Sequence, residues 1–143
     1  MAKLTLDLAQ TIIAKARERA RALNQVPLGY AVVDAGGHVV AMAREDGAGF
    51  LRTEVALAKA WGCFALGFSS RALSERVRDW GSFFTGIAGV AGGRLVPSPG
   101  GVFIRDADGV ALGAVGISGA PSDVDEALAV HGIEAAGLKA DTA

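Results

Sequence analysis

Three charged side chains lie in otherwise apolar segments, and their types and positions are suited to chemistry. Arg44 closes one apolar run, and Glu54 and Lys59 lie in the next, with Lys59 between two alanines. Burying a charge costs free energy unless the charge is paired or used. Two functional interpretations follow: Arg44 and Lys59 hold a carboxylate, or Lys59 and Glu54 transfer protons as acid and base. The structural alternative is a lysine on the wet face of a helix.

Glycines form a second candidate site within residues 95–119, LVPSPGGVFIRDADGVALGAVGISG. Gly100 and Gly101 open an apolar run there, and adjacent glycines leave backbone N–H groups that cradle an anion or form a bulge. The later glycines are spaced G-x-x-G-x-x-G along a predicted strand. A dinucleotide site needs G-x-G-x-x-G at a strand-to-helix turn, and a P-loop needs Gly-Lys-Ser/Thr. Gly113 and Gly116 therefore indicate close packing of a helix, a neighbouring subunit or a planar ligand against the sheet.

The potential metal ligands are few and scattered. His38 follows a glycine turn and is expected to be exposed, and His131 lies in the last predicted helix. Cys63 and Met42 carry soft sulfur donors, but each lies in an apolar run typical of a core. Because no His, Cys or carboxylate pair has metal-ligand spacing, we predict no metal site.

Helices and hairpins must position these residues. Apolar residues at three- and four-residue spacing predict a helix over 5–23 with Thr5 as its N-cap. Further helices are predicted over 53–66, from Ser69 or Ser70 to about Trp80, and from a D-x-x-E capping box at Asp123 and Glu126 to about residue 136. On a helix, Glu54 and Lys59 would be about 140° apart, so they would not form a simple surface pair. Residues 81–101 are expected to be irregular.

Two turns of the same chemistry predict the sheet. The segments 34–37, Asp-Ala-Gly-Gly, and 106–109, Asp-Ala-Asp-Gly, each separate two apolar runs, which is the pattern of a β-hairpin. Consecutive hairpins imply an antiparallel sheet, so the order of elements predicts the α+β class rather than doubly wound α/β.

Composition narrows the classes of function. The chain has 143 residues and a net charge of −1, which predicts one domain over 1–143 and gives no reason to expect nucleic acid or an anionic membrane as partner. Uncharged runs such as 80–93 are too short to span a bilayer. The single cysteine cannot form an internal disulfide, which favours a reducing, cytoplasmic location. A hydrophobic content of 51% is high for a small monomer and predicts a homo-oligomer.

Four segments resemble the GlcG/HbpS-like family, which includes the C-terminal domain of PduO-type proteins. They are VVDAGGHVVAMAREDGA (32–48), AKAWG (58–62), PGGVFI (99–104) and GAVGISGAPSDVDEALAVHGI (113–133), and the similarity covers roughly residues 4–137. The resemblance implies a profilin-like fold, with a mostly antiparallel five-stranded sheet flanked by helices, assembled into dimers or larger oligomers. It also implies haem as a candidate ligand, for which Cys63 or Met42 would be a soft axial donor. Haem can also bind without strong ligation, in an apolar groove of an oligomer with arginines near its propionates. Some family members ligate haem through a histidine in or near the first helix, and residues 4–24 here contain none.

The resemblance adds two residues to the candidate site. Asp125 stands at the family's acidic position after G-x-S-G, and Arg52 replaces a small polar residue that other members often have. We therefore predict a protein that binds a small anionic organic molecule, with haem as the candidate. The predicted ligand-binding residues are Arg44, Arg52, Lys59, Gly100, Gly101 and Asp125. The alternatives are an isomerase or lyase of a small organic acid, with Lys59 and Glu54 as acid and base, and a purely structural or regulatory oligomer.

Overall fold

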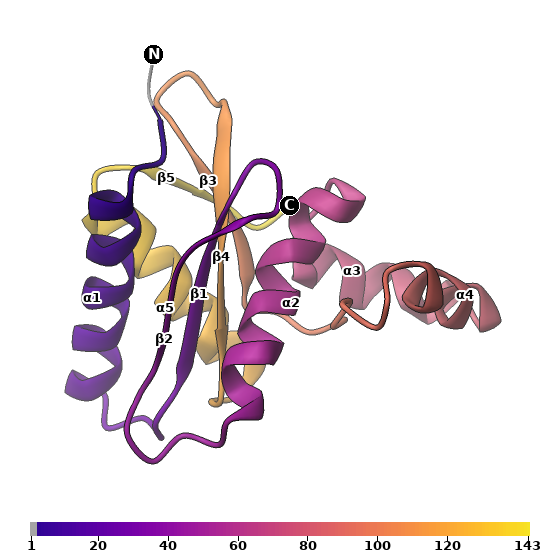
Figure 1. Cartoon of the computed structure of the whole chain (residues 1–143), viewed down its shortest axis with the longest axis horizontal. Coiled ribbons are helices and arrows are strands. Elements are labelled where there is room, and N and C mark those ends of the chain that lie inside the picture. The colour runs from indigo at the N-terminus through magenta and orange to yellow at the C-terminus, as the bar shows by residue number, and fades with distance from the viewer. Residues whose placement is uncertain (1–2) are drawn as a thin grey trace.

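The structure, a computed structural model, describes residues 3–143 and has the predicted α+β architecture. A five-stranded antiparallel sheet lies between two layers of helices (Figure 1). Helices α1 (Leu6–Ala22) and α5 (Ser122–Ala135) cover one face, and α2 (Leu51–Leu66) covers the other. The segment formed by α3 (Ser70–Arg76), a 3-10 turn (Val77–Asp79) and α4 (Ser82–Val90) extends away from the sheet on the α2 side (Figure 1).

Both predicted hairpins are present. They join β1 (Gly29–Asp34) to β2 (Val39–Arg44) and β3 (Gly101–Arg105) to β4 (Ala111–Ser118), and β5 (Lys139–Asp141) completes the sheet in the order β2-β1-β4-β3-β5. Each turn is held by its first aspartate. The Asp34 side chain accepts hydrogen bonds from the backbone N–H groups of residues 36 and 38, and Asp106 accepts those of residues 108 and 110. Asx side chains of this kind stabilise a turn locally, so the sequence pattern was sufficient.

Alternation along the strands divides the core between the two faces. Tyr30, Val32 and Val115 pack against α1 and α5, whereas Val33 and Ala114 pack against α2. The glycines of β3 and β4 let α2 approach closely: a Cβ at position 116 would overlap the carbonyl oxygen of Ala56, and one at 101 would overlap that of Lys59. Close helix packing is therefore what Gly116 provides, as the spacing indicated.

The first and second helices begin and end within two residues of their predicted bounds, and the Thr5 hydroxyl accepts the N–H of Leu8 as an N-cap should. Two elements were not predicted. Residues 82–90 form α4 rather than an irregular segment, and β5 follows the last helix. Helix α4 was not predicted because glycines at 81, 86 and 89 weaken the helical pattern of its sequence. Strand β5 was not predicted because it is three residues long and pairs with β3 at the edge of the sheet, so its sequence carries little strand pattern.

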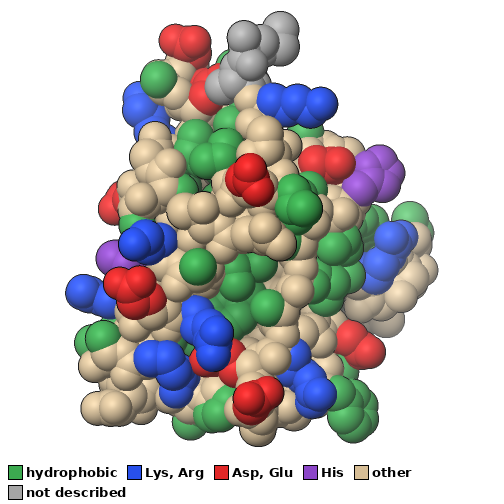
Figure 2. All heavy atoms as spheres, turned by 60° about the vertical axis from the view of Figure 1, so that its left-hand side comes forward, with side chains coloured by type: hydrophobic (Ala, Val, Ile, Leu, Met, Phe, Trp, Pro, Cys, Tyr) green, Lys and Arg blue, Asp and Glu red, His purple; other side chains and the backbone are tan. Residues whose placement is uncertain are grey.

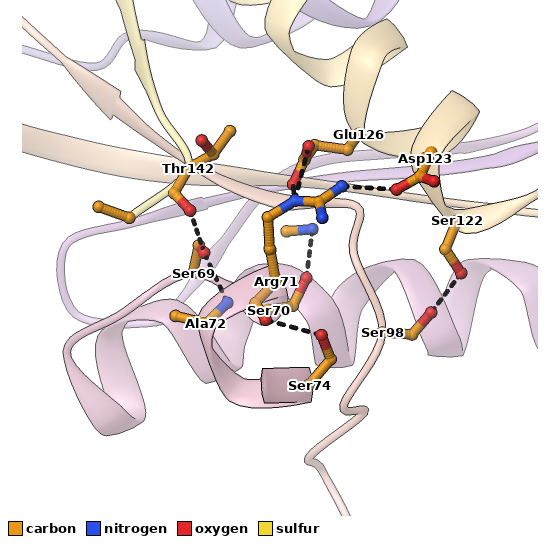
Figure 3. A network of polar contacts seen from close by, with 12 residues as sticks. Ser69, Ser70, Arg71, Ala72, Ser74, Ser98, Ser122, Asp123, Glu126 and Thr142 are labelled. Carbon is orange, nitrogen blue, oxygen red and sulfur yellow. Dashed lines mark hydrogen bonds and ion pairs between the residues drawn. The ribbon is translucent and has the colours of Figure 1, made fainter. Parts of the chain in front are cut away.

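The predicted capping box of the last helix is wrong. Helix α5 begins at Ser122 with Pro121 in the cap position and no side-chain cap hydrogen bond. Asp123 and Glu126 instead bind one guanidinium, because Arg71 of α3 donates to Asp123 at 2.5 Å and to Glu126 at 2.8 Å (Figure 3). The three side chains therefore join the α3 segment to α5.

Candidate functional site

Lys59 and Asp125 form a buried ion pair. The Lys59 ammonium, on α2, lies 3.2 Å from Asp125 Oδ2 on α5, and the two side chains are only 3% and 2% exposed. Lys59 Nζ also donates to the carbonyl oxygen of Ile117 at 3.0 Å, and Asp125 Oδ1 accepts the N–H of Ala120 at 3.1 Å. The pair thus joins helices from opposite faces of the sheet through the end of β4.

Burial opposes the charge of both partners. Desolvation lowers the pKa of Lys59, while the Asp125 carboxylate acts in the opposite direction. Desolvation likewise raises the pKa of Asp125, and the lysine and the backbone N–H groups of residues 119 and 120 partly offset it. The Arg52 charge adds a smaller lowering to the pKa of Lys59. The sequence indicated Arg52, Lys59 and Asp125 as separate candidates. In the structure, the charges of Arg52 and Asp125 both act on the pKa of Lys59.

Gly100 and Gly101 lie against this pair. Gly100 has a φ of +133°, and a Cβ there would stand 2.9 Å from Lys59 Nζ. The Gly101 N–H donates to the Ser70 hydroxyl at 2.7 Å. Two contacts within the protein therefore account for both glycines: room for the lysine, and close approach of α2 and α3 to β3. A backbone anion cradle at these residues stays a prediction.

Arg44 lies at a different place. Its guanidinium donates to the Ala48 carbonyl at 3.0 Å and lines a cavity of about 190 Å³ with Arg17, Tyr30 and Glu45. Glu45 is buried and accepts hydrogen bonds from Tyr30 and the Leu28 backbone. Arg17 and Arg21 pair with its other oxygen at 3.4 and 3.0 Å, so the carboxylate is fully compensated. Burial and the Glu45 carboxylate raise the pKa of Tyr30.

Glu54 lines a cavity of about 400 Å³ on the outer side of α2. Its walls come from α2, the β1–β2 hairpin and the segment after α4, and they consist of Gly37, Val39, Glu54, Leu57, Ala58, Trp61, Gly92, Gly93 and Arg94. The Arg94 guanidinium lies over the Trp61 ring, 3.9 Å from its centroid. Because Lys59 directs its ammonium to Ile117 and Asp125, the acid–base pairing of Lys59 with Glu54 gains no support from this geometry.

A third cavity, of about 430 Å³, is an open groove between α1 and β2. Its walls are Leu6, Gln10, Ile13, Ala14 and Arg17 from α1 and residues 40–43 from β2. Figure 2 brings this side of the molecule forward and shows hydrophobic side chains gathered in a hollow, with Lys and Arg side chains below them. Leu6 is 52% exposed, so this groove presents apolar surface to solvent.

The potential haem or metal ligands are dispersed. The His38 side chain is 82% exposed in its turn, as expected, and His131 lies in a separate surface cavity. Cys63 is buried, and burial raises the pKa of its thiol to about 12, whereas Met42 of the edge strand β2 pairs with Ala31 and directs its side chain to the α2 side of the sheet. Residues 3–143 contain no group of three or more His, Cys, Asp or Glu arranged to hold a metal ion. Over the same residues, no helix combines the length and apolarity needed to cross a membrane.

Sequence reasoning missed Trp61 and Arg94 as a pair, and Arg17 as part of the groove. Arg94 is separated from Trp61 by 33 positions and follows an unpredicted helix, so no local pattern connects them. In the sequence, Arg17 is one of several charged residues on the predicted polar side of α1. Its place at the groove depends on how α1 crosses β2, which is a property of tertiary packing.

A family model described as "Haem degrading protein HbpS-like" matches residues 4–134. No curated protein sequence matches the chain at a significant level. Among solved structures, a PduOC–heme complex superposes with a TM-score of 0.85 at 28% identity, with 98% of this chain and 99% of that one covered. The Klebsiella pneumoniae protein ORFY has a TM-score of 0.83 at 25% identity, with 96% and 93% covered. A double mutant of Streptomyces reticuli HbpS gives 0.79 at 26% identity, with 94% and 88% covered.

Proposed function

Because this chain belongs to the HbpS-like family, we propose that it binds haem or a closely related planar organic anion in the groove between α1 and β2. The observation that carries the proposal is the chemistry of that groove. Apolar walls and a guanidinium lie in one cavity of about 430 Å³, which is within the usual range of ligand pockets. The PduOC relative was solved as a heme complex, which supports the same class of ligand.

The donors in the groove fit haem. Leu6, Ile13 and Val40 offer apolar contact to a porphyrin face, and Arg17 offers a cation to a propionate. Met42 does not direct its thioether toward α1, because it pairs with Ala31 and its side chain lies on the α2 side of the sheet. The groove would therefore hold haem through apolar contact and the Arg17 cation rather than through strong ligation of the iron. When bound, haem would supply a redox-active iron.

Exposed apolar side chains support the further proposal of a homo-oligomer. Phe50 is 77% exposed, Phe83 58% and Val90 91%, and they lie on α4 or just before α2. Such side chains commonly mark surfaces that a second copy covers. Light scattering after size-exclusion chromatography tests this directly, and a mass equal to one chain at micromolar concentration would contradict it. The unpaired, buried Cys63 accords with the cytoplasmic location that we propose.

A haemin titration followed by absorbance tests the ligand. We expect a saturable Soret shift with a fixed stoichiometry in the native chain, and weaker binding in an Arg17→Gln variant. Arg19→Gln is the matched control, because Arg19 lies on the same helix and lines another cavity. A featureless, non-saturating response of the native chain would reject haem. Equal weakening by both variants would remove Arg17 from the site.

A further inference from the structure

The Trp61–Arg94 cavity on the other side of the sheet has the features of a second ligand site. It has about the volume of the α1–β2 groove but different walls: only Val39 comes from β2, and none comes from α1. We propose that it binds a small organic carboxylate, with the carboxylate on Arg94 and the apolar part of the molecule against Val39, Leu57 and Trp61.

The first support is the state of Arg94. Its Nε donates to the Ala91 carbonyl at 2.9 Å, and its guanidinium carbon lies over the Trp61 ring, 3.9 Å from the centroid, so the group is held at two points. None of the ion pairs among residues 3–143 includes Arg94. A guanidinium that is already oriented, and whose terminal nitrogens carry no carboxylate, loses little entropy when it binds one.

The second support is the apolar wall that surrounds this cation. Val39 is 49% exposed, and Leu57 and Trp61 are partly buried. Gly37 approaches the Trp61 ring so closely that a Cβ there would stand 3.0 Å from its Cδ1 atom. Any side chain at residue 37 would press on the indole wall. A cation beside an apolar wall selects an anion with an apolar body rather than an inorganic ion.

Glu54 adds a requirement at the same cavity. It is exposed, and none of the ion pairs of the described residues includes it. A carboxylate in the wall repels the anion unless the ligand also brings a donor or a positive group to it. The preferred ligand class is therefore a carboxylate that carries an amino or hydroxyl group away from its carboxyl end.

The two tryptophans of the chain provide the readout. The indole N–H signals of Trp61 and Trp80 are followed by NMR, with a Trp80→Phe variant to assign them. The probes are benzoate, its neutral analogue benzamide, and para-aminomethylbenzoate. We expect benzoate to move the Trp61 signal saturably, benzamide to leave it unchanged, and the zwitterionic probe to bind more tightly than benzoate.

Variants separate the two charges. Arg94→Gln should weaken benzoate binding about tenfold, the usual effect of one lost charge-assisted hydrogen bond. The matched control is Arg78→Gln, an exposed arginine of the 3-10 turn that does not line the cavity. Glu54→Gln should remove the advantage of para-aminomethylbenzoate over benzoate. Equal binding of benzoate and benzamide, or unchanged affinity in Arg94→Gln, would overturn the proposal. Haemin binding is measured on the same variants and should be unaffected, so failure here is distinct from failure at the α1–β2 groove.

Discussion

Replacing Lys59 with methionine should be strongly destabilising, because it leaves the Asp125 carboxylate buried and unpaired. Asp125 is 1% exposed, and its remaining described polar partners are the backbone N–H groups near Ala120. Removing one partner of a buried ion pair typically costs about 3 to 5 kcal/mol. For a chain of this size, that corresponds to a fall in Tm of roughly 6 to 20 °C. Urea unfolding followed by circular dichroism at pH 7 measures the loss.

The defect of Lys59→Met should depend on pH with a defined sign. Burial raises the pKa of Asp125 in the folded chain, and loss of the lysine removes the main effect that lowers it. The folded variant therefore favours the protonated carboxyl. Its stability is lost as pH rises through the folded pKa and is regained as pH falls below it. The difference in unfolding free energy between native and variant should shrink as pH is lowered from 7 toward 5.

A second substitution isolates the cause of this loss. Asp125→Asn removes the buried charge but keeps an oxygen for the Ala120 N–H. The double variant Lys59→Met/Asp125→Asn should therefore be more stable than Lys59→Met alone. If Lys59→Met costs less than about 1 kcal/mol, or if the double variant is no more stable than the single one, the lysine is not compensating a buried charge.

Three further outcomes follow from packing, capping and burial. Gly116→Ala should cost about 3 kcal/mol in urea unfolding, because its Cβ would overlap the Ala56 carbonyl, whereas Gly86→Ala in open space should not destabilise; equal effects would contradict the close packing. Thr5→Ala should cost about 1 kcal/mol through loss of the N-cap, and an unchanged urea midpoint would contradict it. Burial raises the pKa of the Cys63 thiol to about 12, so Ellman's reagent should react with it only after unfolding; rapid reaction in the native state would show that the thiol is accessible.

The sequence predicted those parts of the fold that have a local cause. The two Asp-initiated turns and the Thr5 cap depend on residues within four positions of one another, and all three are present. The capping box failed because a residue 52 positions away competes for Asp123: Arg71 offers a charged partner that is stronger than the cap N–H. Local chemistry therefore predicted an element only where no distant partner intervened.

The candidate site was predictable to a smaller extent. The sequence indicated Lys59 as a charge among apolar residues and Asp125 through the family resemblance. Their pairing could not be predicted, because it depends on α2 and α5 meeting at the end of β4. Three candidates that are close in sequence point to different places in the structure. Arg44 lines the cavity beside Glu45, Glu54 lines the Trp61–Arg94 cavity, and Lys59 is buried against Asp125. Spacing could identify these residues, but only the packing of the layers decides which of them meet.

The most direct test of the proposed haem site is a haemin titration, followed by absorbance, of the native chain and of an Ala14→Trp variant. Ala14 is exposed and lines the groove between α1 and β2, so a tryptophan there would fill the groove. Ala22→Trp is the matched control, because Ala22 is exposed on the same helix and does not line the groove. We expect saturable binding in the native chain and in Ala22→Trp, and a large loss of affinity in Ala14→Trp. Equal affinity of all three proteins would contradict a haem bound between α1 and β2.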